Sequence, residues 1–468
     1  MDATATRVPW SDVIAEGRLP LFILICLAVW LNAADTLIAA TIMPTVARAI
    51  GGYAYFGWAT AGYLMGSVLA SASSGVLTLR FGLRFATVMS ALFYTAGCVL
   101  SAVAPEIFTF LTGRVLQGIG GGWLSGLASV AIGLLFPNRL LPRVYSAVTS
   151  IWGIAILIGP MLGGLFADRG TWPVVFWLFA GQGVIVAAAA HVMLPASENS
   201  QPARPVAWLQ LGVVGIGIAL ISIADLASDF TRAAVLISLG IGAFILVLML
   251  DDHTTVRLFP KGSGDMRTVH GAGYATLFLL RVATMGLLVE GPAVLQTLRG
   301  LSALESGYIV GVQSLFWTAT ALPVSGLTGE WPNRLIRLGA LTVLVGLAAC
   351  ALVFNDAPLP LVVLVSGLSG AGLGLSYAFL SQAILGDLAA DERAIGGAGI
   401  ATVRLTGAAA GSAMAAAIAN FAGFADGFSI PAAQSAGVWV FVFAMPVAAL
   451  ACRSAWQMGR HRTDRQHA

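Results

Sequence analysis

The sequence predicts an all-α polytopic membrane protein in which two six-helix halves flank two extra helices. Three observations support this fold class. Apolar residues make up 58% of the 468 residues and charged residues only 10%, and the mean hydropathy is +0.89, far from the balance of a soluble globular protein. Long apolar stretches recur along the whole chain. Those before and after a central pair form two sets of six that read alike.

The first set accounts for an N-terminal six-helix bundle at residues 1–194. Crossing ~30 Å of hydrocarbon as a helix takes about 20 apolar residues. Six stretches meet this requirement, at 19–43, 53–78, 84–104, 107–132, 142–167 and 171–194. Glycine is abundant, with 55 residues in the chain. In a membrane this composition favours close helix packing rather than helix breaking.

The central pair of stretches, 206–228 and 232–250, belongs to a linker region at 195–269. The pair carries few charges and no motif, so we interpret it as peripheral scaffolding. Two helices return the chain to the side from which it came, and the orientation of the second half is therefore unchanged. The linker at 195–205 and the polar loop at 251–269 are expected to let the halves rock against each other.

The second set forms a C-terminal six-helix bundle with a polar tail, at residues 270–468. Its stretches lie at 270–297, 303–328, 334–354, 358–385, 392–421 and 430–452, which brings the predicted number of spans to fourteen.

The distribution of Lys and Arg predicts the orientation, because positive loops are retained on the cytoplasmic side. Most of the 24 Lys and Arg residues fall on the side of the N-terminus. The exceptions are Arg48, Arg169, Arg232 and Arg299 on the other side and Arg114, Arg281 and Arg404 within spans. We therefore expect a multi-pass protein of the cytoplasmic (inner) membrane with both termini in the cytoplasm.

Several classes of function are excluded by composition and motifs. The net charge of +3 follows from membrane topology, so the Arg-rich tail is not interpreted as a nucleic-acid site. The four cysteines show neither pairing nor metal-ligand spacing, and no cofactor or metal is expected. Lys261 is the single lysine and follows Pro260, so a phosphate-binding Gly-Lys loop is absent, as are the hydrolase and zinc-helix motifs. Ion-coupled or facilitated transport remains, and the chain is not expected to be an enzyme.

Sequence motifs then give a family resemblance. The stretch Asp35-Thr-Leu-Ile-Ala-Ala-Thr-Ile-Met-Pro44-Thr-Val-Ala resembles the first-helix signature of the fourteen-helix drug:proton antiporter branch of the major facilitator superfamily. Further stretches are similar to other motifs of this branch or the superfamily: Trp58-Ala-Thr-Ala-Gly-Tyr63, Gly113-Arg114-Val-Leu-Gln117-Gly118-Ile-Gly120, Gly159-Pro160-Met-Leu-Gly163-Gly164, Leu295-Gln296, Gly300-Leu-Ser-Ala-Leu-Glu-Ser-Gly307, and Arg404-Leu-Thr-Gly407 with Gly411. The resemblance covers nearly the whole chain. It implies the major facilitator fold and proton-coupled drug export.

One motif departs from the family pattern. The family's loop between helices two and three runs Gly-x-Leu-x-Asp-Arg-x-Gly-Arg-Arg, and the acid helps hold the cytoplasmic gate shut. In this chain Leu79 replaces that acid, whereas Glu330 occupies the corresponding place in the second half. The resemblance implies gating roles for Arg80, Gly82, Arg84, Gly159, Pro160, Gly163, Gly164, Glu330 and Arg404.

Three charged residues are expected inside the membrane at one depth. With 1.5 Å of rise per residue, Asp35, Arg114 and Glu290 lie roughly 10–12 Å from the outer ends of their helices. Charges in hydrocarbon are costly and usually serve function, so these residues are candidates for proton coupling. Alternatives remain: Asp35 hydrogen-bonds Asn32 structurally, Arg114 ties helices together, or Glu290 binds a substrate cation.

Aromatic residues supply candidates for a substrate cavity. The wider set is Trp30, Trp58, Tyr63, Trp123, Trp152, Phe316, Trp317 and Tyr377, and the residues selected as substrate-binding are Asn32, Trp58, Tyr63, Trp152, Glu290 and Trp317. Aromatic walls with one or two acids favour flat, hydrophobic and cationic compounds. The alternative is that these rings face lipid or mark the membrane interface.

The predicted function is therefore proton-coupled export, by antiport, of small amphipathic compounds, cations among them. The expected partners are the small-molecule substrate, protons and the lipid bilayer, and no nucleic acid. Two alternatives stay open. One is export of a dedicated metabolite such as an antibiotic, siderophore or sugar. The other is a transporter-like sensor that moves no substrate, which the loss of the acid at Leu79 favours.

Overall fold

The structure is a computed structural model that describes residues 17–55, 57–137, 140–195, 205–224, 230–324, 327, 330–389 and 392–467. Within these residues the chain forms fourteen α-helices of 17 to 38 residues and two short 3-10 helices, and no strand. Each of the fourteen predicted stretches overlaps one of the long helices. Nine helices in the described part of the chain are long and apolar enough to cross a membrane, and one further apolar helix is shorter.

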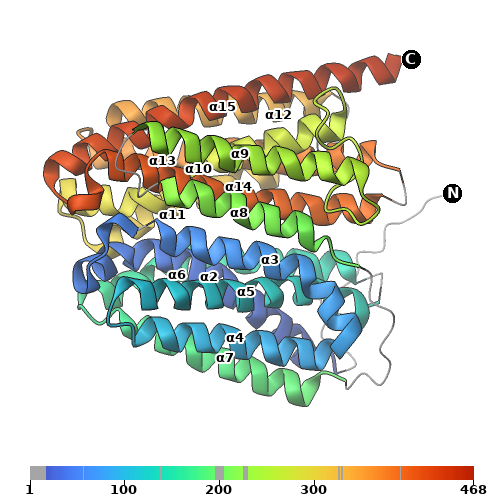
Figure 1. Cartoon of the computed structure of the whole chain (residues 1–468), viewed down its shortest axis with the longest axis horizontal. Helices are drawn as coiled ribbons and strands as arrows, with labels where there is room; N and C mark the ends of the chain where they lie inside the picture. Colours follow the sequence, from blue (N-terminus) through green and yellow to red (C-terminus); the bar gives the residue numbers. More distant parts are fainter. Residues whose placement is uncertain are drawn as a thin grey trace.

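The first six long helices form one layer of the molecule, drawn in blue to green-cyan in Figure 1. They are α2 (Leu19–Ile50), α3 (Trp58–Phe81), α4 (Leu83–Ala102), α5 (Ile107–Leu135), α6 (Leu141–Asp168) and α7 (Pro173–Met193). Helix α2 is longer than predicted, because it continues through Pro44 instead of ending there. Helices in membranes tolerate an internal proline when neighbouring groups satisfy the freed carbonyl.

The last six helices form the opposite layer, drawn in yellow to red. They are α10 (Val269–Arg299), α11 (Ala303–Val324), α12 (Trp331–Val353), α13 (Leu359–Asp387), α14 (Arg393–Phe421) and α15 (Ile430–His467). Helix α15 extends beyond the predicted span, since the polar tail continues the helix past the apolar segment.

The extra pair, α8 (Trp208–Ala224) and α9 (Phe230–His253), packs together on one flank. Helix α8 contacts α3 of the first half and α14 of the second. Only 17% of the apolar part of α9 is buried, so most of this helix faces outward. The pair is therefore peripheral in the structure, and its role as scaffolding stays a prediction.

The loop after α9 is fastened rather than free. The buried carboxylate of Asp251 accepts hydrogen bonds from the backbone N–H groups of Leu258 and Phe259 (3.1 and 2.8 Å) and from the Gln210 side chain (3.0 Å). Arg257 forms an ion pair with Glu392 at 2.9 Å. In this conformation the loop is bonded to both the extra pair and the second half, and its expected role as a hinge stays a prediction. The other predicted hinge falls mainly on residues 196–204, outside the described residues.

The two ends of the bundle differ. The 3-10 helices η1 (Tyr53–Tyr55) and η2 (Phe424–Asp426) lie at one end, on the left in Figure 1, and we call this the η end. Helix α2 begins and α15 ends at the opposite end, which we call the terminus end. Between pairs of described residues, the hydrogen bonds that join the halves lie at the η end: Arg48 to Gln296, Asn420 to Ala54, and Ala303 and Leu304 to Asp168.

Candidate functional site

A buried ion pair lies in the first half. Nη1 of Arg114 on α5 donates hydrogen bonds to both carboxylate oxygens of Asp35 on α2, at 2.8 and 3.0 Å. Each side chain is only 1% exposed. Two charges removed from water in this way are stable only when they are paired and their remaining polar atoms are satisfied. The structure thus brings together two of the three charged residues that the sequence placed at one depth.

Neighbouring groups complete the coordination of Arg114. The side-chain oxygen of Gln117, one turn along α5, accepts a bond of 2.8 Å from Nη1, and the Ala59 carbonyl accepts one of 3.3 Å from Nε. The guanidinium also lies over the Tyr63 ring, 4.6 Å from its centroid. Gln117 stands in the motif quoted from the sequence, but sequence analysis assigned it no role. Residues three apart on a helix are neighbours, so the position of Gln117 three residues after Arg114 could have predicted this hydrogen bond.

Asn32 binds Tyr63 and not Asp35. The Tyr63 hydroxyl donates to the Asn32 side-chain oxygen at 3.0 Å, and the Asn32 amide donates to the Gly121 carbonyl at 3.4 Å. The alternative of a structural bond between Asp35 and Asn32 is therefore wrong. Asn32 is half-buried whereas Tyr63 is buried, so Asn32 is the exposed edge of this polar cluster.

Glycines of α5 make the ion pair possible. A Cβ added to Gly118 would strike the backbone carbonyl of Tyr63 on α3, and one added to Gly122 would strike the backbone of Ser67. Because glycine has no side chain, α5 can approach α3 at backbone distance. Both glycines follow Arg114 on α5, and the close approach there places α3 against Arg114, which contacts Ala59 and Tyr63 of α3 and Asp35 of α2.

Glu290 does not join the pair. It is 2% exposed, and the described partners of Arg114 are Asp35, Gln117, the Ala59 carbonyl and the Tyr63 ring, not Glu290. Gly286, one turn before Glu290 on α10, packs against Val440 of α15. Val294, one turn after Glu290, packs against Gly437 of α15. Glu290 therefore lies on the α10 face that covers α15. Glu290 therefore does not contact the Asp35–Arg114 pair, because the rotation of α10 turns this acid away, and its role in proton coupling stays a prediction.

The other predicted substrate residues are dispersed. Trp58 lies at the η end of α3, where its ring contacts Tyr55 at 6.0 Å. The side chain of Trp152 lies outside the described residues. Trp317 on α11 contacts Tyr377 on α13 with 5.6 Å between ring centroids. The predicted set therefore does not form a single cluster around Asp35.

The α6 motif forms the contact between the halves. A Cβ on Gly159 would lie 3.0 Å from Leu37 on α2, and Gly163 faces Ile38 and Ile42 of the same helix. A Cβ on Gly164 would strike the backbone of Leu304 on α11, and one on Gly307 would lie 2.9 Å from Pro160. These residues, predicted to act in gating, lie where α6 meets α11 at the η end.

The residues predicted to gate the other end make contacts inside their own halves. Arg84 donates to the Leu194 carbonyl at 2.6 Å, Arg80 lies over the Phe81 ring, and Glu330 pairs with Arg334 one turn away at 2.6 Å. Gly82 has φ of +80° and joins α3 to α4, a conformation that favours glycine. The side chain of Leu79 lies outside the described residues. None of these described contacts crosses between the halves. The described contacts of α6 with α11 and the hydrogen bonds between the halves lie at the η end, so the structure is closed at that end.

A methyl group at the η-end contact should loosen it. We expect Gly164→Ala to force α6 away from Leu304, at an overpacking cost of about 1–3 kcal/mol. That cost corresponds to a roughly 5- to 150-fold change in the population of the closed state. A cysteine introduced in place of buried Thr41 should then react faster with a membrane-impermeant maleimide. Gly181→Ala is the matched control, because nothing lies within 4 Å of its added Cβ. Equal reaction rates in both variants would show that this contact does not hold the end closed.

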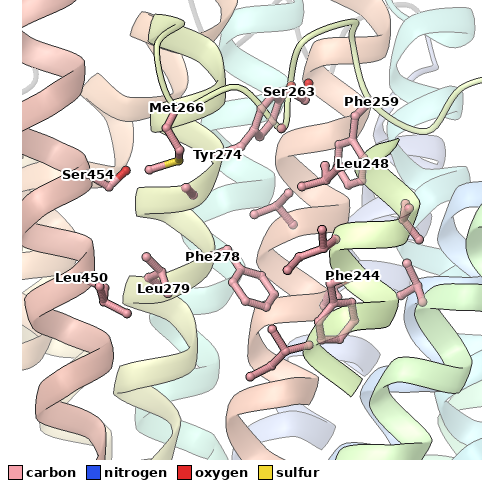
Figure 2. Close-up of a pocket in the computed structure, with 18 of the residues that line it drawn as sticks. Phe244, Leu248, Phe259, Ser263, Met266, Tyr274, Phe278, Leu279, Leu450 and Ser454 are labelled. Carbon is pink, nitrogen blue, oxygen red and sulfur yellow. The ribbon is translucent and has the colours of Figure 1, made fainter. Parts of the chain in front are cut away.

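An apolar pocket of about 570 Å³ lies elsewhere, on the flank of the molecule. Figure 2 shows its walls, with Phe244 and Leu248 from α9, Phe278 and Leu279 from α10, and Leu450 from α15. Ser263, Met266 and Phe259 of the loop after α9 close one end. Asp35 and Arg114 do not line it, so the pocket is separate from the ion pair.

The helical layers and the buried ion pair define a multi-pass membrane protein built as a transporter. Residues 25–412 match the family described as the Major Facilitator Superfamily, and the chain belongs to that superfamily. This is a family of transporters and not a class of enzymes.

Two relatives and one solved structure illustrate the similarity. The chain is 26% identical to a probable multidrug-efflux transporter of Mycobacterium tuberculosis over 444 residues, covering 90% of this chain and 92% of the relative. It is 22% identical to the multidrug efflux pump SdrM of Staphylococcus aureus, covering 78% and 80%. The structure of a D-xylose–proton symporter superposes with a TM-score of 0.62 at 19% identity, covering 91% and 97%, which shows a shared fold.

Proposed function

We propose that the chain exports small amphipathic compounds in exchange for protons that enter the cytoplasm. The observation that carries this proposal is the Asp35–Arg114 pair, because a buried carboxylate held by one cation can exchange that cation for a proton. The names of the relatives support the substrate class, since several are described as multidrug-efflux transporters.

The pair suggests how coupling works. With Arg114 in place, Asp35 stays charged and its burial is compensated. If α2 and α5 separate, the carboxylate loses its partner in a poorly hydrated site, and taking up a proton removes the unpaired charge. Both side chains are 1% exposed in the closed-η state. Proton exchange therefore requires a different conformation, which is the condition for coupling proton movement to alternating access.

The proposed arrangement in the membrane follows the Lys and Arg distribution. All fourteen long helices cross the inner membrane, both termini are cytoplasmic, and the η end is external. The present structure is then the state closed to the outside. We propose boundaries at 1–194, 195–269 and 270–468 for the two bundles and the linker region with the extra pair.

Reconstituted vesicles test this function. The purified protein is placed in liposomes that contain the pH-sensitive dye pyranine, with the membrane potential clamped by valinomycin and potassium. Two probes of permanent charge are added, ethidium as a cation and 2-naphthalenesulfonate as an anion. We expect entry of a transported probe to drive protons out and raise the internal pH. Probe movement at constant internal pH would contradict proton coupling, and movement of neither probe would favour a dedicated exporter or a sensor.

A further inference from the structure

Four side chains from four helices of the second half meet midway along the bundle. The Arg281 guanidinium on α10 lies over the Trp317 ring of α11, 6.0 Å from its centroid, and Trp317 contacts Tyr377 of α13. Arg404 of α14 stands one turn before Gly407, whose added Cβ would lie 3.1 Å from the Cβ of Arg281, so the two arginines belong to adjacent turns of packed helices. All four side chains are partly exposed. We call this group the arginine–aromatic cluster.

The cluster borders the first half at Arg281. On α10, Leu288 packs against Ala33 and Leu37 of α2. Arg281 stands seven residues earlier, which is two helical turns and only about 20° away around the axis. On α14, Arg404 stands seven residues before Gly411, whose added Cβ would strike the Val282 backbone of α10, so Arg404 lies on the face of α14 that meets α10. The cluster therefore reaches the first half through Arg281, and Arg404 joins it from the side of α10, below the closed η end.

No carboxylate of the described residues neutralises the two arginines. Nε of Arg281 is buried without a hydrogen-bond partner, and neither arginine forms an ion pair with a described residue. The acids near the ends of these helices are engaged elsewhere. Asp387 binds His270, Glu392 binds Arg257 and Glu305 binds Ser302. Two adjacent cations within a membrane span are costly without an anion.

We propose that the arginine–aromatic cluster binds the acidic group of an amphipathic aromatic anion. Arg281 and Arg404 would supply a pair of planar donors suited to a carboxylate, sulfonate or phosphate. Trp317 and Tyr377 would contact the flat apolar part of the same molecule. This inference rests on the proposed export function and replaces cations with anions as the preferred substrate. It also assigns Arg404 to the substrate rather than to the gate.

A matched pair of ligands separates charge from shape. The probes are 2-naphthalenesulfonate, a permanent anion, and 2-naphthalenesulfonamide, its neutral analogue. Binding of each radiolabelled probe is measured by scintillation proximity to the full-length protein in lipid nanodiscs. We expect the parent to bind the sulfonate at least about tenfold more tightly than the sulfonamide, equivalent to about 1.4 kcal/mol. Arg281→Gln and Arg404→Gln should each remove this preference, while Arg281→Lys should keep part of it.

Arg337→Gln is the matched control. Arg337 also lies 6.0 Å from a tryptophan ring centroid, that of Trp456, but on α12 and α15. The control should bind the sulfonate as the parent does. Unchanged sulfonamide binding in the Gln variants shows that they are folded.

Equal affinity of the parent for both probes, or an unaltered preference in Arg281→Gln and Arg404→Gln, would overturn the proposal. Because the assay involves no proton movement, sulfonate binding without coupled transport would refute antiport and leave the anion site intact.

Discussion

Asp35→Asn is expected to abolish proton-coupled transport. It also leaves the buried Arg114 charge without its carboxylate, so variant and parent are compared at equal amounts of folded protein. The amide has the shape of the carboxylate and can still accept a hydrogen bond from Arg114, but it cannot take up a proton. In the vesicle assay, probe-driven proton release should fall to the level of protein-free liposomes. Binding of the probe to the variant should remain measurable, because the coupling acid and the arginine–aromatic cluster are on different halves.

Asp251→Asn provides the control for this change. Asp251 is also a buried aspartate with several hydrogen bonds, but it lies at the end of α9 and holds the loop after it. The same isosteric substitution there should leave proton release unchanged once the amounts of protein are equalised. If Asp35→Asn vesicles release protons as the parent does, Asp35 is not the coupling acid.

Arg114→Gln should produce the largest loss of stability. Removing one partner of a buried ion pair leaves the other charge uncompensated, which typically costs about 3–5 kcal/mol. Asp35, Gln117 and the Ala59 carbonyl would all lose a donor. The free energy of unfolding can be measured by SDS titration in mixed micelles. The double variant Asp35→Asn with Arg114→Gln should recover most of the loss, because no charge is left buried.

The exposed pair of Arg334 and Glu330 gives the comparison. Its side chains are 65% and 80% exposed, and solvent screens their attraction. Arg334→Gln should therefore change the free energy of unfolding by less than about 1 kcal/mol. A double variant as unstable as Arg114→Gln alone would mean that the loss comes from the packing of Arg114 and not from the charge left on Asp35.

Much of the first half's site could be predicted from local sequence. Asp35 and Arg114 stand out because charges are rare in apolar stretches, and the rise per residue placed them at one depth. The same reasoning placed Glu290 with them, since depth depends only on position along the helix. The direction of a side chain around the helix axis depends on which neighbours the helix contacts. For α10, these are α15 at Gly286 and the first half at Leu288.

The sequence by itself determined the all-helical fold class, the approximate positions of the long helices and the resemblance to the major facilitator superfamily. Hydropathy and motif spacing are local properties of the chain and can be read without the tertiary structure. Only the tertiary structure decided which charges meet. Asn32 is three residues from Asp35 yet binds Tyr63, whereas Asp35 binds an arginine 79 positions away. Arg281 of α10 likewise contacts the Trp317 ring of the neighbouring helix α11. These pairings follow from helix rotation and from close approach at glycines such as Gly118, which are set by the contacts of whole helices with one another.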